Sequence, residues 1–89
     1  MARVFFTANL RRHVDCQSME AEGATVREVL AKVFASQVGL GTYVLDDQGG
    51  LRKHMTILVD GTRISDIEKL TDPVTETSEV WVMQALSGG

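Results

Sequence analysis

The chain has 89 residues, of which 44% are hydrophobic and 24% charged, with a single proline. This is the composition of one small globular domain, and it excludes a disordered chain and leaves no room for a second domain. Nine basic and twelve acidic side chains give a formal net charge of −3, which argues against nucleic acid or an anionic membrane as the main partner.

The N-terminal segment predicts a β-hairpin. Residues 3–7 are aromatic and β-branched, as strands prefer, and residues 8–12 contain an asparagine and a basic pair that suit a turn. Residues 13–17 then alternate polar and apolar, which indicates a half-buried returning strand.

A helix is expected to follow from Val26. Thr25 stands three residues before Glu28, an arrangement in which the hydroxyl caps the first turn and the carboxylate reaches back to the cap amide. Spacings of three and four place one apolar stripe on this helix, formed by Val26, Val29, Leu30, Val33 and Phe34. Gly39 or Gly41, which tolerate a positive φ, is expected to end it.

The middle of the chain predicts a short strand and then a longer one. Residues 42–45 favour a strand, and residues 46–50 have the composition of a turn. The apolar run 55–59 is a second strand, and it meets Asp60-Gly61, the dipeptide favoured in a two-residue hairpin turn.

The last expected strand lies at the centre of the sheet, because residues 80–83 are apolar at every position. A single helical turn is expected over residues 65–70, before this strand. One main helix for about five strands gives an α+β fold, with a mixed sheet covered on one face. We expect a domain over residues 1–84 and a flexible tail over residues 85–89.

The tail ends in Gly88-Gly89, which suggests chemistry at the chain end. A C-terminal glycine leaves an α-carboxylate with no side chain beside it, so that another enzyme can approach and activate it. Five extended residues reach roughly 16–18 Å, enough to enter a deep active site. Two adjacent glycines also occur by chance, so the signal depends on the strand order that precedes them.

The order of the expected strands and helix, with a final central strand and a terminal Gly-Gly, resembles the ubiquitin-like β-grasp fold. Within that fold it resembles the small sulfur-carrier family, which includes the molybdopterin synthase small subunit, the thiamine-pathway sulfur carrier and the cysteine-synthesis sulfur carrier. The resemblance is most specific over residues 51–61 (Leu-Arg-Lys-His-Met-Thr-Ile-Leu-Val-Asp-Gly) and 79–89 (Glu-Val-Trp-Val-Met-Gln-Ala-Leu-Ser-Gly-Gly).

The resemblance implies that the chain is a protein co-substrate rather than an enzyme. A partner adenylyltransferase, similar to ubiquitin-activating enzymes and using ATP and Mg²⁺, would adenylate the carboxyl of Gly89, with Gly88 as spacer. The product would be a thiocarboxylate that gives its sulfur to a biosynthetic enzyme. Leu86 and Ala85 would contact the channel of the activating enzyme, and no bound cofactor is implied.

Three alternatives stay open. The chain would form a stable complex with a large subunit if it were a subunit of molybdopterin synthase, and isopeptide bonds to lysine if it were a protein modifier. A plain β-grasp interaction module would tolerate loss of Gly88 and Gly89. The loop over residues 39–54 resembles the cysteine-synthesis type, and residues 84–87 lack the proline common in molybdopterin synthase subunits. The cysteine count excludes a ferredoxin.

A docking face is expected on the side of the sheet opposite the helix. Strand alternation sends four large apolar side chains to that side: Phe5, Leu58, Trp81 and Met83. Exposed apolar patches on small proteins often mark interaction sites, although loops that cover this face are the alternative.

The other candidate residues favour structural roles. Cys16 is expected to be a small core residue, and a lone cysteine fits a reducing, cytoplasmic compartment. His13, Asp15 and His54 do not have metal-site spacing, and residues 46–50 lack the ligand pattern of a calcium loop. No signal peptide or membrane span is expected, because no apolar stretch is long enough. No nucleic-acid footprint is expected, because the Lys and Arg residues are dispersed.

Overall fold

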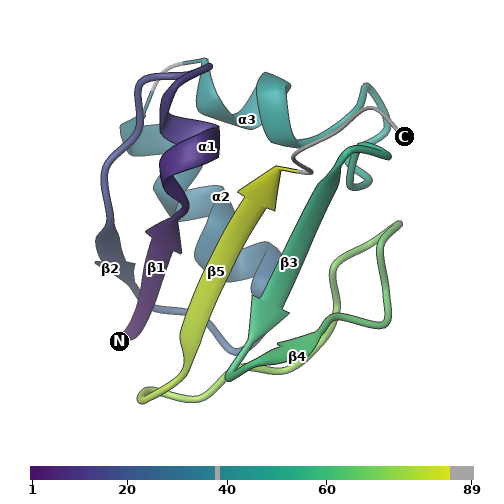
Figure 1. Ribbon diagram of the computed structural model, residues 1–89. Coiled ribbons are helices and arrows are strands. Elements are labelled where there is room, and N and C mark those ends of the chain that lie inside the picture. Colours follow the sequence, from purple (N-terminus) through teal and green to yellow (C-terminus); the bar gives the residue numbers. More distant parts are fainter. Residues whose placement is uncertain (38, 85–89) are drawn as a thin grey trace.

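The computed structural model describes residues 1–37 and 39–84. The elements follow the chain in the order β1 (Ala2–Phe6), α1 (Ala8–Arg11), β2 (Met19–Ala21), α2 (Val26–Ser36), α3 (Leu40–Val44), β3 (Met55–Val59), β4 (Thr62–Arg63) and β5 (Glu79–Gln84). The strands form one five-stranded mixed sheet in the order β2-β1-β5-β3-β4, with α2 across one face (Figure 1). The expected α+β fold with one main helix is confirmed. None of the described helices is long and apolar enough to cross a bilayer.

The last strand lies in the centre of the sheet, as predicted. β5 is parallel to β1 on one side and antiparallel to β3 on the other. The register places Trp81 beside Phe5 of β1 and beside Leu58 of β3. Strands from the two ends of the sequence therefore lie side by side, and all three present the same face at this row.

The core fills the space between the sheet and α2. The sheet contributes side chains with no exposed surface from its three central strands, namely Val4, Ile57, Val80 and Val82. The predicted helix stripe meets them, with Val26, Val29, Leu30 and Val33 buried and Phe34 half-buried. Full burial of one such side chain stabilises the fold by about 1.5–3 kcal/mol, so this layer supplies most of the driving force.

The cap of α2 forms nearly as predicted. The Thr25 hydroxyl accepts a hydrogen bond from the amide of Glu28 at 3.3 Å. The Glu28 carboxylate reaches back one residue further than expected, and accepts from the amide of Ala24 at 3.0 Å. The prediction that a glycine ends α2 is wrong, because the helix already ends at Ser36. Gly39, with a φ of +87°, instead precedes the first residue of α3.

The returning strand is not where the alternation placed it. Residues 8–12 form α1 and its cap rather than a turn, residues 13–17 are a loop, and β2 pairs with β1 only from Met19 onward. Leu10 and Cys16 are both buried, so this stretch packs against the core as a helix and a loop. The alternation of residues 13–17 resembles that of a strand because every second residue, Val14 and Cys16, packs against the core from the loop.

The strand expected over residues 42–45 is wrong. These residues belong largely to α3, in which Leu40 and Val44 are four apart and both fully buried. A helix places side chains at that spacing on one face, and burial there outweighs the strand preference of threonine, tyrosine and valine. Only Leu45 forms a bridge, with Leu51.

The turns predicted over residues 46–50 and at residues 60–61 are confirmed. The Asp46 carboxylate accepts hydrogen bonds from the amides of Gln48 and Gly50, each at 2.9 Å. Asp60 and Gly61 have φ of 50° and 86°, as a two-residue turn between β3 and β4 requires. Residues 65–70 contain one turn, closed by the Leu70 amide bonding to the carbonyl of Asp66 at 2.9 Å, and no longer helix.

Candidate functional site

Four large apolar side chains share the face of the sheet that lies opposite α2. They are half-buried and are the four predicted from alternation: Phe5, Leu58, Trp81 and Met83. Their neighbours along each strand point to the core, so the two sets alternate without a register error. We call these four residues the open face.

The open face is ordered by side-chain contacts across the strands. The rings of Phe5 and Trp81 stack with centroids 4.7 Å apart and an interplanar angle of 21°. Leu58 lies on the other side of Trp81 in the register, and Arg63 of β4 lies beyond Leu58. Stacking holds the indole in place before any partner arrives, which reduces the entropy lost on binding.

The end of β5 is held by two segments that sequence reasoning did not connect to it. The Tyr43 hydroxyl donates to Gln84 Oε1 at 2.7 Å, and the Asn9 side chain donates to the backbone carbonyl of Gln84 at 3.3 Å. Tyr43 belongs to α3 and Asn9 to α1, so both helices fix the last described residue of the central strand (Figure 1). No sequence signal links these positions, because the contacts depend on α1 and α3, which the sequence predicted as a turn and a strand.

The two histidines both contact the ring of the same tyrosine. The His13 ring stacks on Tyr43 at a centroid distance of 6.5 Å, and the His54 ring meets it edge-on at 6.1 Å. Over residues 1–37 and 39–84, no group of three or more His, Cys, Asp or Glu side chains could hold a metal ion. The histidines therefore contribute to the packing around the end of β5.

The predicted covalent site and channel residues lie outside the described residues. These are Ala85, Leu86, Gly88 and Gly89, and their predicted roles stay predictions.

Cys16 occupies a core position, as expected for a small apolar residue. It is a free cysteine with 4% of its surface exposed. Burial raises the pKa of its thiol, Arg11 opposes that rise, and Asp15 adds a smaller increase. A raised pKa keeps the sulfur protonated at neutral pH, which disfavours a role as nucleophile.

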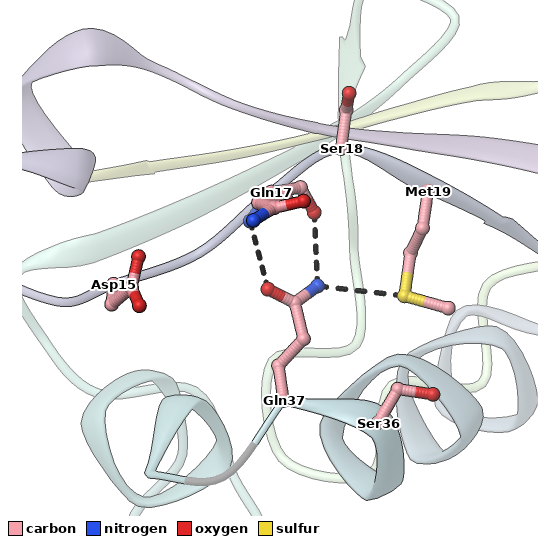
Figure 2. Close-up of a pocket in the computed structure, with 6 residues that line it drawn as sticks. All are labelled: Asp15, Gln17, Ser18, Met19, Ser36 and Gln37. Atoms are coloured by element: carbon pink, nitrogen blue, oxygen red, sulfur yellow. Dashed lines mark hydrogen bonds between the residues drawn. The ribbon is translucent and has the colours of Figure 1, made fainter.

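A surface hollow lies between α2 and the loop that precedes β2. Figure 2 shows the Gln37 side chain bridging it, with Asp15 and Ser36 on its walls. The Gln37 amide accepts from the Gln17 backbone amide at 2.8 Å and donates to the Gln17 carbonyl at 2.9 Å, as a neighbouring strand would. The Gln37 side chain therefore provides hydrogen-bond partners for the backbone groups of Gln17. We assign this hollow a structural role, which is to connect the loop to the end of α2.

Comparison with protein families gives one match that spans almost the whole chain. The model of the ThiS family matches residues 4–89, which include all four residues of the open face. The comparison with curated protein sequences found no similar protein.

Solved structures with the same fold cover the chain from end to end. A chain in the crystal structure of the Amycolatopsis orientalis BexX/CysO complex has a TM-score of 0.82 at 24% identity, with 100% of each chain covered. Mycobacterium tuberculosis CysO gives 0.79 at 22%, covering 97% of this chain and 100% of that one. The small archaeal modifier protein 1 of Methanosarcina acetivorans gives 0.78 at 23%, covering 99% and 95%. These likenesses establish a shared fold.

Proposed function

Since this chain belongs to the ThiS family of ubiquitin-like β-grasp sulfur carriers, we propose that it carries sulfur as a thiocarboxylate on Gly89. In this role it is a protein co-substrate, charged by one enzyme and discharged by another. The observation that carries the proposal is the family match over residues 4–89, which runs through both final glycines.

The proposed chemistry has two steps. A carboxylate oxygen of Gly89 attacks the α-phosphate of ATP, bound with Mg²⁺ in the partner adenylyltransferase, and pyrophosphate leaves. Hydrosulfide then attacks the carbonyl carbon of the acyl adenylate, and AMP leaves with the bridging oxygen. The net result replaces one carboxyl oxygen by sulfur, and the thiocarboxylate then donates that sulfur to a biosynthetic enzyme.

The folded domain would bind the partner enzyme and position the C-terminal tail relative to it. The open face offers an aromatic pair and a methionine, side chains that are enriched at interface centres. Because the Tyr43 and Asn9 side chains bind Gln84, the end of β5 has a fixed position relative to that face. A partner that grips the open face therefore meets the tail at a defined point, with Leu86 and Ala85 proposed to line the entry to its channel.

Intact-mass spectrometry tests the covalent step. The purified chain is first weighed to establish that Gly89 is its last residue, and is then incubated with the ThiS-type adenylyltransferase of the same genome, ATP, Mg²⁺ and sulfide. We expect a mass gain equal to the difference between sulfur and oxygen. A variant that lacks Gly88 and Gly89 is the control and should gain nothing, while an unchanged mass of the intact chain with active enzyme would refute the proposal.

Steady-state kinetics of the same reaction test the docking role. Trp81→Ala should raise the KM of the carrier about tenfold with little change in kcat, because it removes a binding anchor and leaves the reacting carboxylate untouched. Lys32→Ala, on the outer side of α2, is the matched control. Equal KM values for the two variants would exclude the open face as the docking surface.

Protein modification is the second candidate, since a protein named as a small archaeal modifier shares this fold. A modifier would appear as higher-mass conjugates that survive denaturing electrophoresis and disappear when Gly89 is removed. Copurification with a stable large subunit would instead favour the molybdopterin synthase alternative.

A further inference from the structure

A second surface feature lies at the opposite edge of the sheet from β2, outside the open face. It is a groove of about 320 Å³ over the outer edge of β3, between the segment that leads into β3 and the segment that follows β4. Figure 1 shows these two segments on the β4 side of the sheet. The groove is lined by Leu51, Arg52, Lys53, Met55, Thr56, Ile57, Arg63, Ile64 and Ile67.

The floor of the groove is apolar. Met55, Ile57 and Ile64 are buried beneath it, and Ile67 stands beside them with 52% of its surface exposed. Among the described residues only Met1 is a comparably exposed large hydrophobic side chain. The backbone of Ile67 is fixed, because its carbonyl accepts from the Leu51 amide at 2.7 Å. Its exposed side chain is therefore held at the groove by a fixed backbone.

The rim of the groove is basic. Arg52, Lys53 and Arg63 are three of the nine Lys and Arg residues in a chain of net charge −3, and no residue that lines this groove is acidic. Of the acids that follow Arg63 in the sequence, Asp66 and Asp72 face their own loop, whereas Glu68 is exposed beside Ile67. Asp66 accepts from the Thr71 hydroxyl at 2.6 Å, and Asp72 accepts from the amide of Ser65 at 2.9 Å.

We propose that this groove binds an acidic segment of a partner protein, anchored by one large apolar side chain. The apolar side chain packs on Ile67 and Ile64, and flanking carboxylates pair with the cations of the rim. Arginine offers several N–H donors in a planar fork that matches a carboxylate. The groove adjoins the open face, because Arg63 lies opposite Leu58 in the sheet register. One partner can therefore hold both surfaces at once.

The charge distribution favours a protein segment over a nucleic acid. The far end of the sheet carries a hollow whose charged lining is three glutamates, Glu20, Glu76 and Glu79, and one arginine, Arg3. A long phosphate backbone that extended from the groove would meet this net negative molecule, whereas a short acidic peptide needs only the groove itself. The inference does not depend on the chemistry at Gly89.

NMR titration of the full chain with a synthetic peptide tests the proposal. The peptide carries one leucine flanked by glutamates, and two control peptides replace either the leucine by serine or the glutamates by glutamines. We expect amide shifts at Leu51, Thr56, Ile64 and Ile67 with the first peptide, and at least tenfold weaker binding with either control. Affinity should also fall as salt rises from about 0.05 to 0.5 M, because the contacting charges are exposed to solvent.

Matched variants separate binding from folding. Arg63→Glu and Ile67→Ser should each weaken the peptide about tenfold without changing the thermal unfolding midpoint, because both side chains are exposed. Lys32→Glu makes the same charge change on α2 and should leave the affinity unchanged. Equal affinities for Arg63→Glu and Lys32→Glu, shifts outside the groove, or tighter binding of an oligouridylate at these residues would each overturn the proposal. Mass gain at Gly89 is measured separately, so failure of one proposal does not imply failure of the other.

Discussion

The two faces of the sheet use the same strands for different purposes. On the covered face, Val80 and Val82 of β5 have no exposed surface and pack toward α2. On the open face, Trp81 and Met83 of the same strand stay half-buried, although they are larger. Hydrophobic burial would reward covering the larger pair, so size alone does not explain which face is covered.

The two faces of the sheet carry different kinds of apolar side chain. The covered face is filled with branched aliphatic side chains that lose little freedom on burial, as a stable core requires. The open face has an aromatic pair and a methionine, which suit contact with a partner. If this division is correct, substitutions on the covered face should cost stability, and those on the open face should chiefly cost binding.

Neighbouring residues of β3 give the largest contrast. Ile57 is fully buried on the covered face, whereas Leu58 is half-buried on the open face. We expect Ile57→Ala to lower the free energy of unfolding by about 2–4 kcal/mol, because it leaves a cavity, and Leu58→Ala to lower it by about 1 kcal/mol or less. Urea denaturation measures both. Equal losses would show that the open face is part of the core.

The approach of the chain to α2 is the next most sensitive point of the covered side. A Cβ on Gly23 would lie 2.8 Å from the backbone nitrogen of Val29 and 2.8 Å from the Cβ of Glu28. Since a backbone atom cannot move aside cheaply, Gly23→Ala should cost about 1–3 kcal/mol in unfolding free energy.

Gly41→Ala is the control for that substitution. The heavy atom nearest to the added Cβ belongs to the Phe34 side chain, at 3.2 Å, which can shift more easily than a backbone atom. The position also lies inside α3, where alanine is favoured over glycine. We expect a change within about 0.5 kcal/mol, which thermal or urea unfolding resolves from the larger loss. A tolerated Gly23→Ala would mean that the start of α2 is less tightly packed against the preceding chain.

The open face should make a smaller contribution to stability, through its aromatic pair. The stacked rings of Phe5 and Trp81 should be coupled by about 0.5–1.5 kcal/mol beyond the area they bury. A double-mutant cycle with Phe5→Ala, Trp81→Ala and the double variant measures that coupling by urea denaturation. A coupling near zero would mean that the indole is not held before a partner binds.

The sequence was sufficient for the covered and open faces of the strands, and insufficient for the connections. Period-two alternation placed Phe5, Leu58, Trp81 and Met83 together because a strand has only two faces. The same rule failed at residues 13–17, where Val14 and Cys16 face inward from a loop, and strand propensity failed at residues 42–45, which lie largely in α3. In both places the tertiary packing of Leu10, Leu40 and Val44 decided the conformation, and local propensity could not report it.

The candidate site was predictable only in part for the same reason. The apolar face followed from alternation alone, but the contact between Tyr43 and Gln84 joins residues 41 positions apart. It needs α3 to be a helix, and it needs the end of β5 to lie under that helix. The basic groove likewise depends on the path of residues 63–67 beside residues 51–53, which turn composition does not specify.

The smallest expected effect lies in the loop after β4, which closes the covered side near the start of α2. The Thr71 hydroxyl, and after it the Lys69 amide, lower the pKa of Asp66 below its ordinary value of 3.8. Between the two pKa values the unfolded chain binds more protons, so this carboxylate stabilises the fold fully above pH 3.8 and progressively less as the pH falls through the folded value.

Replacing Asp66 therefore tests whether this loop supports the covered side. Asp66→Asn should reduce stability at neutral pH, and the difference from the parent chain should shrink as the pH falls below 3.8. Thr71→Val, which keeps the side-chain shape but removes the hydroxyl, should show part of the same pH dependence. Thermal unfolding midpoints from neutral pH to about pH 2 measure both. A difference that does not change with pH would mean that the loop is held by its buried Leu70 rather than by the carboxylate, because the side chain of Leu70 does not titrate.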